Sequence, residues 1–189
     1  MKPKRNYKPG KLDECQTPGY ALEPIYSLIG RNMVVCDPCS GEGILVNQFT
    51  KSGYHTMCGD IQDGQDFLVS TKENWYIGKD YPPVFVTNPP FSLKYKFLSK
   101  CYELEFPFAL LMPVETIGTK TAQEMFKQHG IGIIWLSKRV NFKMPYKKWE
   151  NSAAQFPAAW FTHNLGIDGK NVFYDCSSWT KEYRSRFEI

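Results

Sequence analysis

The sequence predicts a single α/β domain built on a doubly wound sheet. Short apolar runs alternate along the chain with helical patterns, which is typical of sheets crossed by helices. A length of 189 residues, with 42% hydrophobic and 15% aromatic residues, suits one packed core and argues against disorder. No repeat, low-complexity tract or linker divides the chain. We therefore expect a basic arm at residues 1–15 and one domain at residues 16–189.

The first half of the chain supplies two helices and three strands. A helix is predicted at residues 17–28, where a proline stands in the favoured first turn. Residues 33–36 are apolar throughout, which predicts a fully buried parallel strand. A glycine turn, a helix at residues 44–51 and a second strand at residues 55–60 follow. The third strand is predicted at residues 84–87, after a turn-rich segment.

The second half repeats this alternation. Residues 93–104 have a helical pattern and residues 108–112 form an apolar run. A helix at residues 119–129 ends at a glycine, and strands are predicted at residues 131–136 and 158–161. In such sheets the ligand crevice lies beyond the carboxyl ends of the strands, so polar residues at those ends are candidates for a binding site.

Composition and cysteine content indicate the compartment. No stretch approaches the roughly 18 apolar residues that a membrane span requires, and no apolar signal follows Met1. We expect a cytoplasmic protein without membrane contact, in which the six cysteines stay reduced. Cys36 and Cys39 form a C-x-x-C, but no second pair of similar spacing completes a zinc site. Ordinary packing, without a metal, is the prediction for this pair.

Positive charge is concentrated in two segments. Ten of the 23 basic residues lie in residues 1–11 and 138–149, which hold no acid, while the rest of the chain has 13 basic and 19 acidic residues. Such clustering is what contact with a polyanion requires. A solvated tail and a soluble loop would give the same pattern, so charge alone leaves both interpretations open.

A glycine turn directly follows the first predicted strand. Its sequence is Asp37-Pro38-Cys39-Ser40-Gly41-Glu42-Gly43, and its glycines permit a tight turn and close approach of a ligand to the backbone. The Asp37 carboxylate can attract a cationic group. Asp60 closes the second strand, where a carboxylate can accept bonds from ribose hydroxyls. A nicotinamide fingerprint needs Gly or Ala where Val46 stands, and no phosphate-binding Gly-Lys-Ser/Thr occurs.

A second motif, Thr87-Asn88-Pro89-Pro90-Phe91-Ser92, ends the third predicted strand. Its prolines fix their own φ angles and extend the residues before them, which gives a stiff segment at a strand tip. The Asn88 side chain and the Pro89 carbonyl can accept both protons of an NH2 group, and Phe91 can stack on a flat base. A purely structural Pro-Pro turn is the alternative explanation.

The two motifs together resemble those of class I, Rossmann-like amino-methyltransferases, and especially the compact phage-type enzymes of the DNA adenine-N6 group. Residues 37–43 are similar to that family's S-adenosylmethionine-binding turn, and Asn88-Pro89-Pro90-Phe91 is similar to its catalytic tetrapeptide. The resemblance covers about residues 16–163 in the family's order. The cofactor-binding residues that it implies are Gln16, Thr17, Pro18, Asp37, Pro38, Gly41, Gly43, Asp60, Ile61, Asp66 and Phe67.

The resemblance implies a mostly parallel, seven-stranded sheet with helices on both faces, and transfer of a methyl group from S-adenosylmethionine to the N6 amine of adenine. S-adenosylhomocysteine would be the product, and no metal is required because the donor is already activated. Acceptors at Asn88 and Pro89 would favour the pyramidal, attacking amine. A duplex base must first be flipped out, and stacking on Phe91 would offset about 1–3 kcal/mol of that cost.

The resemblance also implies a nucleic-acid interface. The family often places a second aromatic near the flipped base, where this chain has Phe142, although core packing explains that residue equally well. The implied contacts are Arg139, Phe142, Lys143, Lys147 and Lys148. DNA is favoured over RNA. Because the chain has no room for a target-recognition domain, specificity is slight or depends on a partner subunit or homodimer, and a phage or mobile-element origin would fit.

Several alternatives stay open at this point. The interval from Asp60 to Asp66 is short, so the family's usual second helix and third strand are expected to be trimmed, and Asp63 is an alternative to Asp66. Asn-Pro-Pro-aromatic also serves enzymes that methylate RNA adenine, cytosine N4 and protein glutamine. A non-catalytic nucleic-acid-binding subunit on the same fold is a further alternative, although such a subunit would often have lost one motif.

Overall fold

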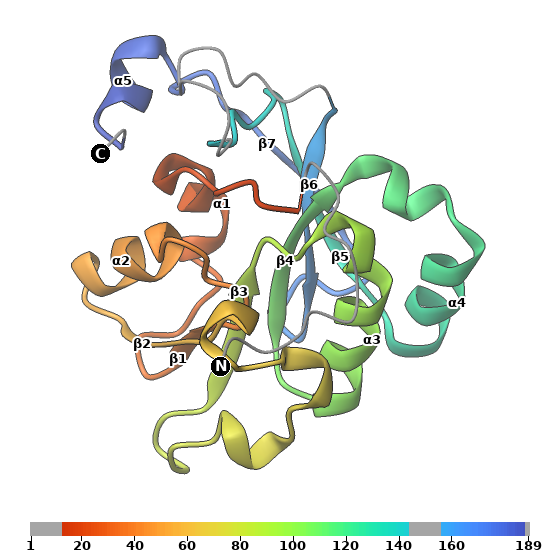
Figure 1. Ribbon diagram of the computed structural model, residues 1–189. Helices are drawn as coiled ribbons and strands as arrows, with labels where there is room; N and C mark the ends of the chain where they lie inside the picture. Colours follow the sequence, from red (N-terminus) through yellow and green to blue (C-terminus); the bar gives the residue numbers. More distant parts are fainter. Residues whose placement is uncertain (1–12, 144–155, 188–189) are drawn as a thin grey trace.

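The computed structural model describes residues 13–143 and 156–187 (Figure 1). These residues form a seven-stranded sheet in the order β2-β1-β3-β4-β6-β5-β7. All neighbouring strands are parallel except β6, which runs antiparallel to β4 and β5. The predicted doubly wound, mostly parallel sheet is confirmed. The strands are β1 (Val34–Asp37), β2 (His55–Cys58), β3 (Pro83–Thr87), β4 (Phe108–Pro113), β5 (Gly132–Leu136), β6 (Ala158–His163) and β7 (Asn171–Tyr174).

Helices cover both faces of the sheet, with α1 and α2 on one side and α3 and α4 on the other (Figure 1). The helices predicted at residues 44–51, 93–104 and 119–129 form as α2, α3 and α4. Each connects two strands, which brings the strand ends that carry the motifs to one edge of the sheet. The helices are α1 (Glu23–Tyr26), α2 (Ile44–Lys51), α3 (Lys94–Leu104), α4 (Lys120–His129) and α5 (Lys181–Ser185).

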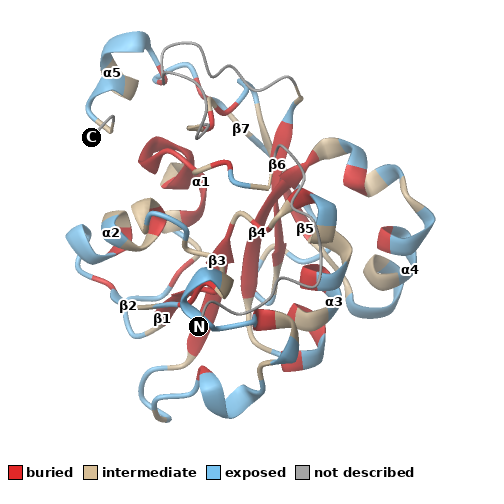
Figure 2. Cartoon of the chain, in the orientation of Figure 1, coloured by how far each residue is buried: buried red, intermediate tan, exposed pale blue. Residues whose placement is uncertain are grey.

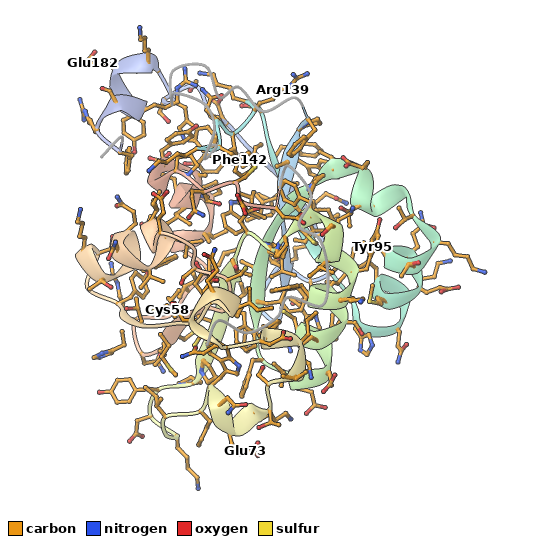
Figure 3. The ribbon with its side chains drawn as sticks, in the orientation of Figure 1. Cys58, Glu73, Tyr95, Arg139, Phe142 and Glu182 are labelled. Atoms are coloured by element: carbon orange, nitrogen blue, oxygen red, sulfur yellow. The ribbon has the colours of Figure 1, made fainter. Side chains whose placement is uncertain are left out.

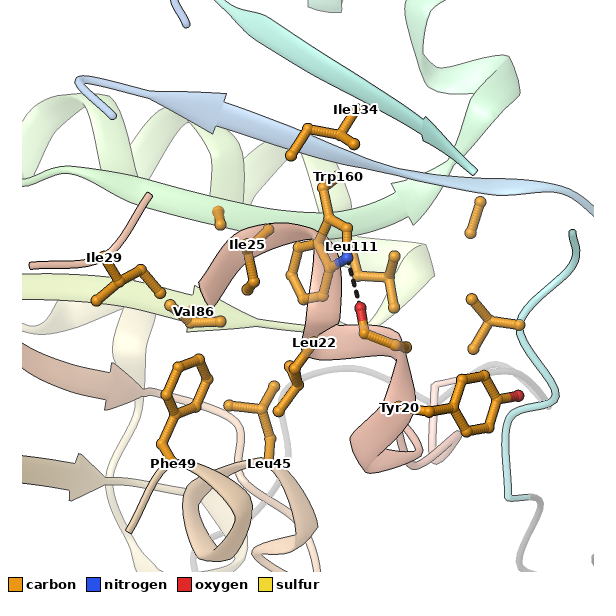
Figure 4. Close-up of a cluster of buried hydrophobic side chains, with 14 of the residues drawn as sticks. Tyr20, Leu22, Ile25, Ile29, Leu45, Phe49, Val86, Leu111, Ile134 and Trp160 are labelled. Carbon is orange, nitrogen blue, oxygen red and sulfur yellow. Dashed lines mark hydrogen bonds between the residues drawn. The ribbon is translucent and has the colours of Figure 1, made fainter. Parts of the chain in front are cut away.

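The first predicted helix is broken in two. The sequence predicts one helix over residues 17–28, but the chain forms the 3-10 turn η1 (Gly19–Leu22) and then the four-residue α1. Pro24 explains the break, because it has no N–H to continue the hydrogen-bond ladder of a single helix. The backbone here is tied to the sheet instead, since Trp160 Nε1 donates to the carbonyl of Ala21 at 2.9 Å (Figure 4).

The core lies on both faces of the sheet, and Figure 2 shows the central strands buried almost throughout. Alternate residues of a strand face opposite sides, so Val84 and Val86 belong to one cluster and Phe85 to the other. Figure 4 shows Val86 with Ile25 of α1 and Phe49 of α2. Each large side chain buried in this way contributes roughly 1.5–3 kcal/mol. Burial on both faces is also why these strands are continuous apolar runs in the sequence.

The segment between β2 and β3 is compact, as the short interval after Asp60 predicts. Residues 59–82 contain neither an α-helix nor a strand. In their place are three 3-10 turns, η2 (Ile61–Asp63), η3 (Phe67–Val69) and η4 (Lys72–Asn74). The sheet therefore has β2 at its edge, and the end of β2 stays next to the glycine turn.

Two elements at the far end of the chain are not predicted by the sequence analysis. β7 is an edge strand whose side chains alternate between exposed and half-buried, and Phe173 is 81% exposed. Its four residues carry too little apolar periodicity to identify a strand. The five-residue α5 is equally short. No helix within the described ranges is long and apolar enough to cross a bilayer.

Candidate active site

The carboxyl ends of β1 and β3 border a pocket. These strands are parallel neighbours, so Asp37 at the end of β1 and Asn88 directly after β3 emerge at the same edge of the sheet. The cavity there measures about 420 Å³, which suits a small-molecule site. The predicted site residues that line it are Gln16, Thr17, Asp37, Gly41, Asp60, Ile61, Asn88 and Pro90.

Four other predicted site residues are close in sequence to the residues that line the pocket. Pro18, Pro38 and Pro89 are buried, and Gly43 is half-buried at the start of α2. These residues shape the backbone on which the lining side chains are carried. Residues 13–15, which the sequence analysis assigns to the basic arm, also belong to the pocket wall.

The glycine turn is held closely by Gln16. Gly41 has φ 52° and Gly43 has φ 75°, a left-handed conformation that favours glycine. A Cβ atom at Gly41 would lie 2.2 Å from Gln16 Nε2, so a larger residue at this position would displace the Gln16 side chain. Gln16 Oε1 also accepts a bond from the Glu42 N–H at 3.2 Å. The N-terminal segment therefore closes one side of the glycine turn.

Asp60 joins the end of β2 to the same turn. It is 8% exposed; its Oδ2 accepts a bond from the Gly41 N–H at 3.0 Å and its Oδ1 from the Gln62 N–H at 2.8 Å. Each carboxylate oxygen has a further lone pair, so Asp60 can fix the turn and still accept a hydroxyl of a ligand.

Asp37 is a buried carboxylate at the base of the pocket. It is 3% exposed, and its Oδ1 accepts bonds from the Thr87 hydroxyl at 2.7 Å and the Cys39 N–H at 3.2 Å. Burial raises the pKa of Asp37 to about 7; these two bonds oppose the rise and the Asp60 carboxylate adds to it. The charge on Asp37 is therefore sensitive to pH near neutrality.

Asn88 lines the pocket and carries a buried, unpaired acceptor oxygen. Its Nδ2 donates to the carbonyl of Cys15 at 2.9 Å, which leaves Oδ1 as the other side-chain polar atom. That oxygen is buried and has no hydrogen-bond partner within residues 13–143 and 156–187, and neither has Thr17 Oγ1. Buried polar atoms are normally paired, so both oxygens are candidates for accepting a bond from a ligand.

Residues 13–17 run along the pocket from the segment after β3 to the glycine turn. The Asp13 carboxylate accepts bonds from the Ser92 N–H at 2.9 Å and the Ser92 hydroxyl at 2.6 Å. Gln16 and Lys143 exchange two backbone hydrogen bonds of 2.9 Å. This segment consequently fixes the position of the Cys15 carbonyl that orients Asn88.

Phe91 and Phe142 are packed against each other. Phe91 is 7% exposed, and its ring meets those of Phe142 and Phe156 edge-on, with centroids 6.0 Å and 5.2 Å away. Phe142 is 1% exposed and lies inside the molecule (Figure 3), which favours its packing role over contact with a base. Stacking of a base on Phe91 would require a neighbouring ring to shift.

Asp66 and Phe67 lie apart from the first pocket. They line a second cavity of about 440 Å³ beside β2. Asp66 Oδ1 accepts the Leu68 N–H at 2.9 Å, and the buried Phe67 ring stacks on Phe97 with centroids 5.1 Å apart. Asp63, the alternative to Asp66, does line the first pocket. The short segment after β2 brings Asp63 rather than Asp66 to the glycine turn.

The predicted nucleic-acid contacts divide into three groups. Arg139 is exposed (Figure 3). Lys143 is 32% exposed, and its Nζ pairs with Glu42 Oε2 at 2.6 Å on the rim of the cavity, so its charge is largely neutralised within the protein. Lys147 and Lys148 lie outside the described residues.

The charge of the first pocket is negative. None of its described lining residues is Lys or Arg, whereas six carry carboxyl groups. Such a lining attracts a cationic ligand and repels phosphate. The described residues contain no cluster of three or more His, Cys, Asp or Glu side chains that could hold a metal ion. The acidic lining residues are Asp13, Glu14, Asp37, Glu42, Asp60 and Asp63.

This chain resembles solved methyltransferase structures at 10% and 12% sequence identity. No family model matches it, and no curated protein is similar to it in sequence. The 23S rRNA methyltransferase ErmE is similar in structure with a TM-score of 0.46 and 12% identity, over 77% of this chain and 64% of ErmE, so the chain spans less than two thirds of ErmE. A predicted O-methyltransferase, Atu636 from Agrobacterium tumefaciens, gives 0.43 and 10%, over 85% of each chain. TM-scores and identities this low do not establish a function, so the proposed function rests on the residues of the site.

Sequence reasoning missed three residues that build the site. Asp13 anchors Ser92, Thr87 donates to Asp37, and Cys39 Sγ lies 2.8 Å from Thr87 Oγ1 and 3.5 Å from the carbonyl oxygen of Asn88. The sequence assigned Cys39 to ordinary packing. One signal for Thr87 was present, since it is the polar end of an otherwise apolar strand immediately before Asn88.

Proposed function

We propose that this protein is an S-adenosylmethionine-dependent methyltransferase that methylates the N6 amine of adenine in DNA. The observation that carries the proposal is the unpaired, buried Oδ1 of Asn88 at the wall of an acidic pocket. An acceptor in that position suits an NH2 group, and a pocket of that charge suits a cationic cofactor.

The described residues fit S-adenosylmethionine. Its sulfonium and ammonium groups are cationic, and the pocket holds Asp37 and five other acidic residues without a described Lys or Arg. Asp60, already bonded to the glycine turn, has lone pairs left for ribose hydroxyls. When bound, the cofactor would supply a methyl group that is activated by the positive charge on sulfur.

The chain's own part in the reaction is to hold the amine. Asn88 Oδ1 and the Pro89 carbonyl oxygen would accept its two protons and favour the pyramidal geometry in which the nitrogen lone pair is available. The bond from Asn88 Nδ2 to the Cys15 carbonyl keeps the side-chain amide from turning over. The Asn88 amide is thus oriented before the amine binds, and this orientation is the main catalytic contribution that we assign to the protein.

A nucleic acid is the proposed substrate because basic residues are concentrated in residues 1–11 and 138–149. DNA adenine is preferred to RNA adenine on the resemblance of the two motifs to the DNA group. A base in duplex DNA would be flipped out to reach Asn88, and a partner subunit or second copy would contribute to sequence specificity.

The test is methyl transfer with labelled S-adenosylmethionine to DNA, RNA and protein offered separately, followed by mass spectrometry of the nucleosides. We expect label in DNA as N6-methyladenine. Label confined to RNA, to protein or to cytosine N4 would overturn the substrate assignment. Calorimetry with the cofactor alone is the companion measurement, and a protein that binds none would be a nucleic-acid-binding subunit rather than an enzyme.

A further inference from the structure

The Thr87 hydroxyl connects the two ends of the candidate site. Thr87 is the last residue of β3, has no exposed surface and directly precedes Asn88. It donates to Asp37 Oδ1 at 2.7 Å, and Cys39 Sγ lies 2.8 Å from its oxygen. A hydroxyl has one proton. Because Thr87 uses this proton in its bond to Asp37, the Cys39 thiol must donate to the Thr87 oxygen.

We propose that Thr87 is a positioning residue that holds Asp37 in its ionised form and so sets the lowest pH at which the pocket binds a cationic cofactor. The proposal rests on the proposed function for the identity of that cofactor. The interaction of Thr87 with Asp37 is a property of the protein itself and can be measured without any ligand.

The surroundings of Asp37 otherwise oppose its charge. Asp60 faces it from the end of β2, Asp13 and Glu14 line the same pocket from the N-terminal segment, and the nearby Cys39 is a neutral thiol whose pKa is raised by burial and by Asp37. No Lys or Arg is among the described lining residues.

Two neutral donors stabilise the carboxylate, the Thr87 hydroxyl and the Cys39 N–H. The thiol of Cys36, also on β1, is buried in the core and supplies no positive charge. Of the two donors, the hydroxyl makes the shorter bond, at 2.7 Å against 3.2 Å. A bond to an ionised group is stronger than one to a neutral group, so Thr87 favours the ionised form of Asp37.

The consequence is a link between the cofactor turn and the catalytic segment. While Asp37 is ionised, Thr87 is fixed by its bond to β1, and the residue that follows, Asn88, is held with it. When Asp37 is protonated, the pocket loses one negative charge at its most buried point. Affinity for a cation then falls, and the proposed cofactor would bind more weakly below the pKa of Asp37 than above it.

The test is the nearly isosteric variant Thr87→Val, with Thr87→Ser as the conservative rescue. The 13C carboxyl resonance of Asp37, assigned with Asp37→Asn, is followed from about pH 5 to about pH 9 without ligand. We expect Thr87→Val to raise the titration midpoint by about one pH unit and Thr87→Ser to return it, since one bond to a charged group is removed and restored. Thr116→Val, at another fully buried threonine, is the matched control and should leave the midpoint unchanged.

Calorimetry with S-adenosylmethionine over the same pH range gives the second readout. Thr87→Val should weaken binding several-fold near pH 7 and hardly at all near pH 9, where Asp37 is ionised in both proteins. An unchanged Asp37 midpoint, or an affinity loss equal at every pH, would show that Thr87 is merely structural and would overturn the inference. A midpoint that moves in a protein that binds no S-adenosylmethionine would instead count against the proposed function alone. If Thr87→Val does not fold, the shift between wild type and Thr87→Ala decides the same question.

Discussion

At the scale of single residues, the site keeps groups that burial makes unfavourable. Asn88 Oδ1 is buried without a described partner, which costs about 1–3 kcal/mol, and Asp37 is a carboxylate with 3% exposure. Neither is needed for packing, since apolar residues of similar size would fill the same space at lower cost. Groups of this kind are typical of functional sites, and two predictions follow from them.

Asn88→Ala should retain cofactor binding and lose most turnover. The change removes one acceptor of the substrate amine, and loss of a preorganised group of this type costs about 10²–10³ in kcat. Single-turnover methyl transfer and calorimetry measure the two properties separately. Asn32→Ala, in the exposed turn before β1, is the control. Wild-type turnover in the Asn88 variant would contradict the assigned role.

Asp37→Asn should stabilise the protein at neutral and higher pH while weakening cofactor binding. The pKa of Asp37 is raised to about 7 by burial, against about 3.9 in the unfolded chain. Between these values the folded protein binds the extra proton, so the free energy of unfolding falls as pH rises from about 4 to about 7. Asparagine does not ionise, so the free energy of unfolding of the variant does not fall in this way.

The gain should reach up to about 4 kcal/mol near pH 8 and vanish near pH 4, because both forms are then neutral. Thermal unfolding of the two proteins at several pH values measures it. If the variant and the wild type are equally stable at pH 8, burial does not disfavour the ionised form of Asp37.

At the scale of elements, a carboxylate at the start of α1 fastens the end of the chain. Glu23 accepts bonds from Trp179 Nε1 at 2.6 Å, from the Tyr183 hydroxyl on α5 and from the Tyr174 hydroxyl on β7 at 3.4 Å. Both β7 and α5 are too short to be stable alone. The pairing of β7 with β5 also holds this end of the chain, and the bonds to Glu23 and the apolar contacts of Trp179 add to that pairing.

Glu23→Ala should lower the free energy of unfolding by about 2–3 kcal/mol, because bonds to a charged acceptor are lost and partly buried donors are left unpaired. Amide exchange should rise first in residues 171–187. Glu182→Ala, at an exposed position on α5, is the control and should change neither measurement. A uniform increase in amide exchange across the whole chain of the Glu23 variant would contradict a local anchoring role.

At the scale of the whole molecule, charge is divided between a negative pocket and two basic segments. This separation suits a protein that binds a cation and a polyanion at once. The pairing of Lys143 with Glu42 on the pocket rim leaves fewer free cations near the site than the sequence suggests. Binding to nucleic acid would then depend mainly on the other basic residues.

Reversal of two charges, Lys147→Glu with Lys148→Glu, should weaken nucleic-acid affinity and flatten its dependence on salt, since fewer counterions would be released on binding. Titrations at several salt concentrations measure both. Lys120→Glu with Lys127→Glu, on the exposed face of α4, makes the same change in net charge and should have a smaller effect. Equal effects of the two pairs would mean that only net charge matters.

The sequence by itself determined six of the seven strands, the main helices and the place of the two motifs. Strand and helix patterns are local, and buried strands such as residues 84–87 are apolar throughout because both faces of the sheet are covered. The motifs begin at strand ends, so the rule for parallel sheets was sufficient to bring Asp37 and Asn88 together. The edge strand β7 was not predicted, because its apolar pattern is weak and its partner strand β5 is distant in sequence.

Only the tertiary structure decided which side chains complete the site. Thr87 and Cys39 are 48 residues apart and interact across two neighbouring strands, a relation that no local pattern records. Burial of Phe142 and the pairing of Lys143 with Glu42 likewise depend on segments that meet only after folding. Local periodicity fixes elements, whereas burial and electrostatics depend on the contacts among them, and those contacts set the charge and the orientation of each site residue.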